Sequence, residues 1–201
     1  MAEAVCIFKV NRMFSSVAAS GCILLGTIFI LVSVRSMSWS QSKTSQSSKG
    51  LWQFSSNDRN FYYEDYAKLP DGHHAAQIIT SMSIGLGCLA IFIFPFHIIV
   101  SVMGRPVSRR VHHYLGLLVF TITTIGWGSS VASIIIWGFF VHDSEMYIFG
   151  TGFVMCLVGG FFMFLGGMEA YNATRDYPQA APPRHYPPPA IAKPRLARIE
   201  L

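Results

Sequence analysis

The chain has 201 residues, of which 52% are apolar, 14% aromatic and only 12% charged. A soluble domain typically carries about 25% charged residues, so this composition excludes an ordinary soluble globular protein. The net charge is +5, and the basic excess lies on one side of the apolar stretches, as in membrane proteins whose cytoplasmic side is basic. We therefore expect no nucleic-acid partner.

Four stretches contain no Asp, Glu, Lys or Arg, namely residues 13–34, 75–103, 114–141 and 146–168. Each reaches the length of about 20 residues that a bilayer-spanning helix needs. The first stretch is too long for the apolar region of a signal peptide, so we expect an uncleaved span. The sequence thus predicts one all-α membrane domain over residues 13–170, an antiparallel four-helix bundle whose first partner is the lipid bilayer.

The basic residues indicate how this domain is oriented. Ten of the fifteen Lys and Arg residues lie in residues 1–12, in the loop between the second and third stretches, or after the fourth stretch. Because basic residues accumulate on the cytoplasmic side, we expect both termini in the cytoplasm and a location in the plasma membrane. Residues 35–74 and 142–145 are then the extracellular loops.

The first of these loops contains two aromatic segments, residues 50–54 and 61–66, which favour β-strands. Asn57 and Asp58 between them are typical of a turn. We therefore expect a small extracellular antiparallel sheet within this loop. Residues 40–49 are expected to form a flexible connection, and Trp39 is expected to lie at the membrane interface, where aromatic residues accumulate.

Residues 171–201 form a proline-rich tail, with seven prolines after Tyr177. Such a segment cannot build a core and is expected to be disordered. Its last residues, Ile199, Glu200 and Leu201, fit the ligand pattern of a PDZ domain, which predicts a cytoplasmic scaffold as a partner. Cys6 lies close to the first span, and its palmitoylation is left open.

Small residues recur every four positions in two of the spans. They are Ala18, Cys22 and Gly26 in the first span, and Gly152, Cys156 and Gly160 in the fourth. Such ridges let helix backbones approach closely in lipid. They favour packing within the bundle, and self-association through the same faces is the alternative.

No catalytic motif is present, and we expect no enzyme activity, no cofactor and no metal site. The spans lack charged residues, which argues against a pump or a transporter. Adjacent pairs at His73-His74 and His112-His113 are poor chelators, because neighbouring helical side chains diverge by about 100°. We expect His112 and His113 to face lipid and solvent. His97, an ionisable side chain within a span, is a candidate functional residue, and its position near the inner end also allows it to reach the membrane surface.

Trp39, followed by Gly50, Leu51 and Trp52 in the first loop of a four-span chain, resembles the signature of the claudin superfamily. This group includes the claudins, the peripheral myelin and epithelial membrane proteins, and the calcium-channel gamma subunits. Residues 63–77 and 149–167 resemble the family's entry into the second span and its glycine-rich fourth span. The resemblance implies a four-helix bundle with an extracellular sheet.

One departure from the family concerns its disulfide. Members usually carry two cysteines shortly after the Gly-Leu-Trp motif, whereas this loop has none. We expect stacking of Phe54, Phe61 and Tyr63 to replace part of the stabilisation, at about 0.5–1.5 kcal/mol per aromatic pair.

Two functions follow from these observations. The first is a claudin-like protein that organises cell–cell contacts or junctions through its first loop and lateral self-association. The alternative is an auxiliary subunit that modulates the gating or trafficking of an ion channel or receptor.

Overall fold

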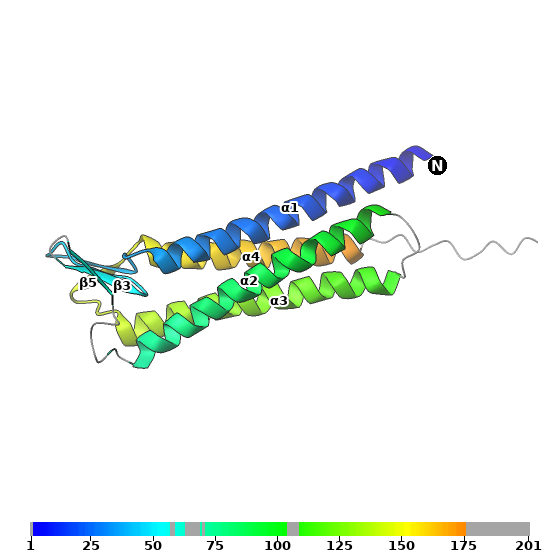
Figure 1. Ribbon diagram of the computed structural model, residues 1–201. Helices are drawn as coiled ribbons and strands as arrows, with labels where there is room; N and C mark the ends of the chain where they lie inside the picture. The colour runs from blue at the N-terminus through cyan, green and yellow to red at the C-terminus, as the bar shows by residue number, and fades with distance from the viewer. Residues whose placement is uncertain (1, 57–58, 63–68, 70, 104–108, 176–201) are drawn as a thin grey trace, which may run out of the picture.

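The computed structural model describes residues 2–56, 59–62, 69, 71–103 and 109–175. In this part of the chain four long helices run side by side, α1 (Ala2–Arg35), α2 (Asp71–Met103), α3 (Arg109–Ile136) and α4 (Thr151–Arg175). A small sheet lies at one end of the bundle, and the start of α1 and the end of α4 lie at the opposite end (Figure 1). We call these the sheet end and the opposite end.

All four helices are long and apolar enough to cross a membrane. The qualifying segments are Phe14–Arg35, Gly72–Ile99, Val111–Val141 and Thr151–Thr174. The third segment continues from α3 into a π-helical turn, η2 (Trp137–Val141), and α2 continues through Pro95 to Met103. The fold is therefore mostly helical and compatible with the predicted four-span bundle.

The helices are apolar on their outward faces and carry small or hydroxyl side chains inside. Leu24 and Leu31 of α1, for example, are exposed, whereas Ala19 and Ser33 of the same helix are buried. A soluble bundle shows the reverse arrangement, with polar residues outside. This distribution suits a bundle whose surroundings are lipid.

Glycines on two faces of α4 allow close approach of its neighbours. A Cβ built on Gly159 would lie 2.7 Å from the carbonyl oxygen of Gly26 in α1, and one built on Gly160 would lie 3.0 Å from Cβ of Ser130 in α3. Gly166 repeats the contact with α1 and Gly167 repeats the contact with α3, each seven residues later. Helix α4 is thus packed between α1 and α3 on two glycine faces.

The sheet has five strands, β1 (Ser40–Ser42), β2 (Ser48–Lys49), β3 (Gln53–Ser56), β4 (Arg59–Tyr62) and β5 (Tyr147–Phe149). Their order is β4-β3-β2-β1-β5, and every neighbouring pair is antiparallel. An antiparallel pair is present in the first loop as predicted, but with shifted bounds: β3 shares residues 53–54 with the predicted segment 50–54, and β4 shares residues 61–62 with the predicted segment 61–66. The predicted turn at Asn57 and Asp58 lies outside the described residues.

Strand β5 lies within residues 146–168, which we predicted to be the fourth span, so that span begins later than predicted. Its residues pair with β1 in the register Ser40↔Phe149, and α4 begins only at Thr151. The reason lies in partners distant in the sequence, because the backbone N–H of Gly150 donates to the carbonyl of Trp39 and that of Gly152 donates to the carbonyl of Ser38. These bonds hold residues 147–150 extended, although their composition also suits a helix in lipid.

The prediction that residues 40–49 form a flexible connection is wrong. They contain β1, β2 and an ordered turn between them, which the backbone N–H of Ser42 closes by donating to the carbonyl of Ser47. Within the turn, the backbone N–H groups of Thr44 and Ser45 donate to Oγ of Ser42. Serine hydroxyls commonly stabilise turns by such bonds, and a serine-rich composition alone does not separate an ordered turn from a mobile one.

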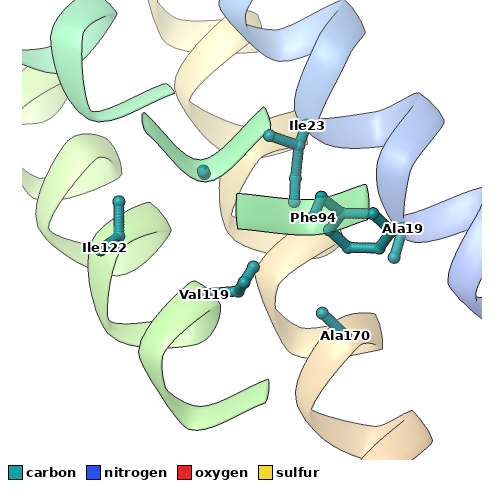
Figure 2. Close-up of a cluster of buried hydrophobic side chains, with 7 residues drawn as sticks. Ala19, Ile23, Phe94, Val119, Ile122 and Ala170 are labelled. Atoms are coloured by element: carbon teal, nitrogen blue, oxygen red, sulfur yellow. The ribbon is translucent and has the colours of Figure 1, made fainter. Parts of the chain in front are cut away.

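The apolar core of the bundle contains side chains from every helix. Figure 2 shows Phe94 of α2 close to Ala19 and Ile23 of α1, with Val119 of α3 and Ala170 of α4 in the same buried cluster. Such a cluster closes the bundle interior with hydrocarbon.

Candidate functional site at the junction of sheet and helices

Trp39 is the centre of the contact between the sheet and the helices. It is 0% exposed, and its Nε1–H donates to the carbonyl of Ser33 at 2.8 Å. Its ring lies 5.1 Å from that of Trp137 in η2 and 6.4 Å from that of Phe153 in α4. Trp39 is therefore a core residue just after the first apolar segment, where α1, β1, η2 and α4 meet.

Gly50 and Leu51 complete this contact from the other end of β2. A Cβ on Gly50 would lie 2.7 Å from Cα of Met37, so only glycine fits beside the chain that leaves α1. Leu51 is buried, and its carbonyl accepts from two side chains of α2, Nε2 of His73 at 2.7 Å and Nε2 of Gln77 at 2.8 Å. The start of α2 is thereby fixed to the sheet.

Trp52 differs from the other three signature residues. Its side chain is 40% exposed, while Trp39 and Leu51 are buried and Gly50 is enclosed by backbone. Three of the signature residues thus form the junction, and Trp52 remains on the surface beside β3.

A closed circuit of contacts, which we call the junction ring, joins six side chains. Trp137 Nε1–H donates to Oγ of Ser40 at 3.0 Å, and Ser40 Oγ lies 2.8 Å from Nδ1 of His142. The ring of His142 stacks on Phe149 of β5 at 4.0 Å, and Phe149 stacks on Phe153 at 4.1 Å. Through Trp39 the circuit returns to Trp137. The junction ring therefore ties β1, β5, η2 and α4 into one unit.

His142 is the titratable member of this ring outside the apolar segments. Burial lowers the pKa of His142 below its ordinary value of 6.5, the carboxylate of Asp143 opposes this shift, and Lys43 and Lys49 add to it. Lys43 is held nearby because its Nζ donates to the carbonyl of Ser144, and Nζ of Lys49 lies 4.3 Å from the centre of the Tyr147 ring. Burial therefore favours the neutral form of the His142 imidazole in the junction ring.

Beneath the junction, hydroxyl groups join α2 to α3. Ser83 Oγ of α2 lies 2.8 Å from Ser130 Oγ of α3 and donates to the carbonyl of Gly126. One turn closer to the sheet, a second hydroxyl pair joins the same helices, between Thr80 Oγ1 and Ser133 Oγ. Hydrogen bonds between helices contribute about 0.6 kcal/mol each in a membrane. Because these hydroxyls bond one another and backbone carbonyls, they serve packing and do not line a water-filled path.

Two histidines meet near the opposite end. His97 of α2 is 0% exposed and His112 of α3 is 2% exposed, and their rings stack at 4.8 Å. The expectation that His112 faces lipid and solvent is wrong, and so is the expectation that His97 reaches toward the membrane surface. Sequence reasoning missed this pair, although His97 follows the buried positions Ser83, Ala90 and Phe94 at helical spacing.

The small residues predicted to pack helices fall in different places. Gly26, Gly152 and Gly160 lie in close helix contacts and Cys156 is buried, whereas Ala18 is exposed and Cys22 is partly exposed. The surface of α1 that meets α4 runs through Ala19, Ile23 and Gly26, so it coincides with the predicted ridge at Gly26 and lies one residue beyond it at Ala18 and Cys22.

Several predicted features lie outside the described residues. These are Tyr63, the side chain of Cys6, and the tail with Ile199, Glu200 and Leu201. The described part of the chain contains no group of three or more His, Cys, Asp or Glu side chains that could hold a metal ion. Cys22, Cys88 and Cys156 are free thiols.

No protein-family model matches the chain, and no curated protein matches it either.

Proposed function

We propose that this chain is a claudin-like four-span membrane protein that organises contacts between cells through the sheet at one end of its bundle. The observation that carries the proposal is the sheet itself, which combines strands from two separate loops. Buried side chains fix the sheet to the helices, while Trp52 and Tyr62 stay exposed at 40% and 59%. A rigid platform with exposed aromatic groups suits recognition of another protein surface.

The proposed setting is the plasma membrane, with the sheet outside the cell and both termini in the cytoplasm. The surplus of Lys and Arg at the opposite end supports this orientation. The tail that follows α4 is then cytoplasmic, and Ile199, Glu200 and Leu201 are available to a PDZ scaffold. Such a scaffold would anchor the contact to the cell interior.

Lateral self-association is part of the proposal. Strands β4 and β5 are the two edges of the described sheet, and each has one strand neighbour. Edge strands offer backbone N–H and C=O groups to a further strand. The bundle interior is filled by the hydroxyl contacts and the apolar cluster, so the proposed activity lies at the surfaces of the protein.

The test is the distribution of a tagged chain in cultured cells that form no junctions of their own. We expect enrichment where two expressing cells touch, and no enrichment where an expressing cell touches a non-expressing one. The Trp52→Ala variant should reach the surface but lose the enrichment, because Trp52 is exposed and does not belong to the junction.

Trp39→Ala is the matched control, because it removes a buried tryptophan from the same motif. It should reduce surface delivery itself, since truncating a core Trp costs about 3–5 kcal/mol of stability. Uniform staining of the unmodified chain over the cell surface, with no enrichment where two expressing cells touch, would contradict the adhesion function. Co-purification with a much larger membrane protein would then support the auxiliary-subunit alternative.

A further inference from the structure

A hydrogen bond joins Ser40 of β1 to His142, whose ring is stacked on Phe149 of β5. An indole N–H can only donate, so Ser40 Oγ accepts from Trp137 Nε1. The hydroxyl hydrogen of Ser40 is then directed at His142 Nδ1, 2.8 Å away. Because Ser40 is 1% exposed, its hydroxyl hydrogen needs a protein acceptor, which favours the tautomer with an unprotonated Nδ1 and the imidazole hydrogen on Nε2.

Protonation of His142 reverses this bond. An imidazolium donates from both nitrogens, so Nδ1–H and the Trp137 N–H would both point at Ser40 Oγ. The hydroxyl hydrogen of Ser40 would lose the imidazole as its acceptor. A displacement of the His142 ring would also disturb its stack on Phe149 of β5, whose centre lies 4.0 Å away.

The charged groups around His142 come from each segment packed against it. Asp143 adjoins it in the chain and favours the cation, while Lys43 after β1 and Lys49 of β2 oppose it. From β5 it faces Phe149, and Tyr147 of that strand lies under Lys49. His73 of α2 is a second imidazole that contacts Trp137, with ring centres 5.1 Å apart.

We propose that His142 is an acid-sensitive latch that holds β5 against β1, and that its protonation releases β5 from the sheet. Once β5 separates, His142 is solvated and regains an ordinary affinity for protons. The latch is therefore closed above pH 6.5, the ordinary pKa of histidine. Below that value the opening equilibrium rises by at most about tenfold per pH unit, until the pKa of the closed form is passed. The proposal concerns the fold and does not depend on cell adhesion.

The test is amide hydrogen exchange of the full chain, purified in lipid nanodiscs, at pH 7.5 and pH 5.5. After correction for the intrinsic pH dependence of exchange, protection of the β1–β5 amides should fall roughly three- to tenfold at pH 5.5. The reporting amides are those of Lys43 and Gly150, which donate to the carbonyls of Met146 and Trp39. Amides between β3 and β4 serve as an internal reference and should not change.

Two substitutions assign the effect to a residue. His142→Gln keeps a neutral acceptor near Ser40 and should abolish the pH dependence, whereas His74→Gln, an exposed histidine at the same end, should leave it intact. If His142→Gln retains the loss of protection and His73→Gln removes it, the sensor is His73 and the proposal is overturned. Unchanged protection of the unmodified chain at pH 5.5 overturns it as well.

A measurement on the unmodified chain covers the case in which His142→Gln does not fold. The nitrogen chemical shifts of the His142 imidazole should show an unprotonated Nδ1 at pH 7.5. Titration of His142 should give a pKa below 6.5. A proton on Nδ1 at pH 7.5, or a pKa above 6.5, contradicts the latch.

Discussion

Single glycines decide how closely the helices approach, and the structure separates those that are needed from those that are not. A Cβ on Gly26 would lie 2.5 Å from the carbonyl oxygen of Gly159 and 2.7 Å from the backbone nitrogen of Met163. A Cβ on Gly21, in the same helix, would meet nothing within 4 Å. The two positions look alike in the sequence and differ only in what faces them.

We therefore expect Gly26→Ala to destabilise the protein by about 1–3 kcal/mol, the usual cost of overpacking. The thermal midpoint of the purified protein in detergent measures this directly. Gly21→Ala is the matched control and should leave the midpoint unchanged or raise it slightly, because alanine has the higher helix propensity. Equal midpoints for the two variants would show that α1 and α4 are not in close contact at Gly26.

At the scale of elements, the first loop contains no cysteine that could cross-link its strands, and an aromatic pair joins two of them. Phe54 and Phe61 are direct partners in the β3–β4 register, and their rings stack at 5.2 Å with 20° between the planes. Stacking across a strand pair stabilises a sheet without any covalent bond. This agrees with the predicted contact between Phe54 and Phe61.

A double-mutant cycle with Phe54→Leu and Phe61→Leu measures this contact. We expect a coupling energy of about 0.5–1.5 kcal/mol beyond the two separate losses of apolar contact. Thermal unfolding, followed by the amide exchange of β3 and β4, provides the values. Additive effects of the two substitutions would mean that the rings do not stabilise each other.

The elements differ in how far the sequence could predict them. The four helices follow from long uncharged segments, and β3 and β4 follow from aromatic residues with high β propensity. Strands β1, β2 and β5 have two or three residues each, too short for an alternating pattern. They form because partners distant in the sequence pair with them, as Ser40 pairs with Phe149.

The junction was predictable only in part for the same reason. Trp39, Gly50 and Leu51 stand out as a motif, but their burial depends on contacts with Trp137 and Gln77, which lie far along the chain. His142 carries no sequence signal at all, because its importance comes from Ser40 and Phe149 on either side of it.

The whole molecule has one sheet end and one end with the start of α1 and the end of α4 (Figure 1). In the proposed orientation, a cysteine replacing the exposed Ser45 of the β1–β2 turn faces outside the cell. A cysteine replacing Gln179 in the tail faces the cytoplasm. The two positions therefore report the orientation of the bundle independently.

We expect an impermeant maleimide to label Ser45→Cys in intact cells, and to label Gln179→Cys only after permeabilisation. The unmodified chain measures the background from its four native cysteines. Labelling of Gln179→Cys in intact cells would place the tail outside and reverse the topology.

The packing of α4 against α1 also has a consequence for how the protein is made. Helix α1 is synthesised before α2 and α3, yet its most extensive helix contact is with α4, which leaves the ribosome after all of them. Strand β1 likewise cannot pair with β5, the strand just before α4, until β5 has been synthesised. The surface of α1 that meets α4 is therefore uncovered during most of translation. A chain that stops before Tyr147 lacks both α4 and β5, so its bundle and its sheet are incomplete. Nonsense mutations throughout the first three helices should consequently be equivalent, each yielding a product for membrane quality control to degrade.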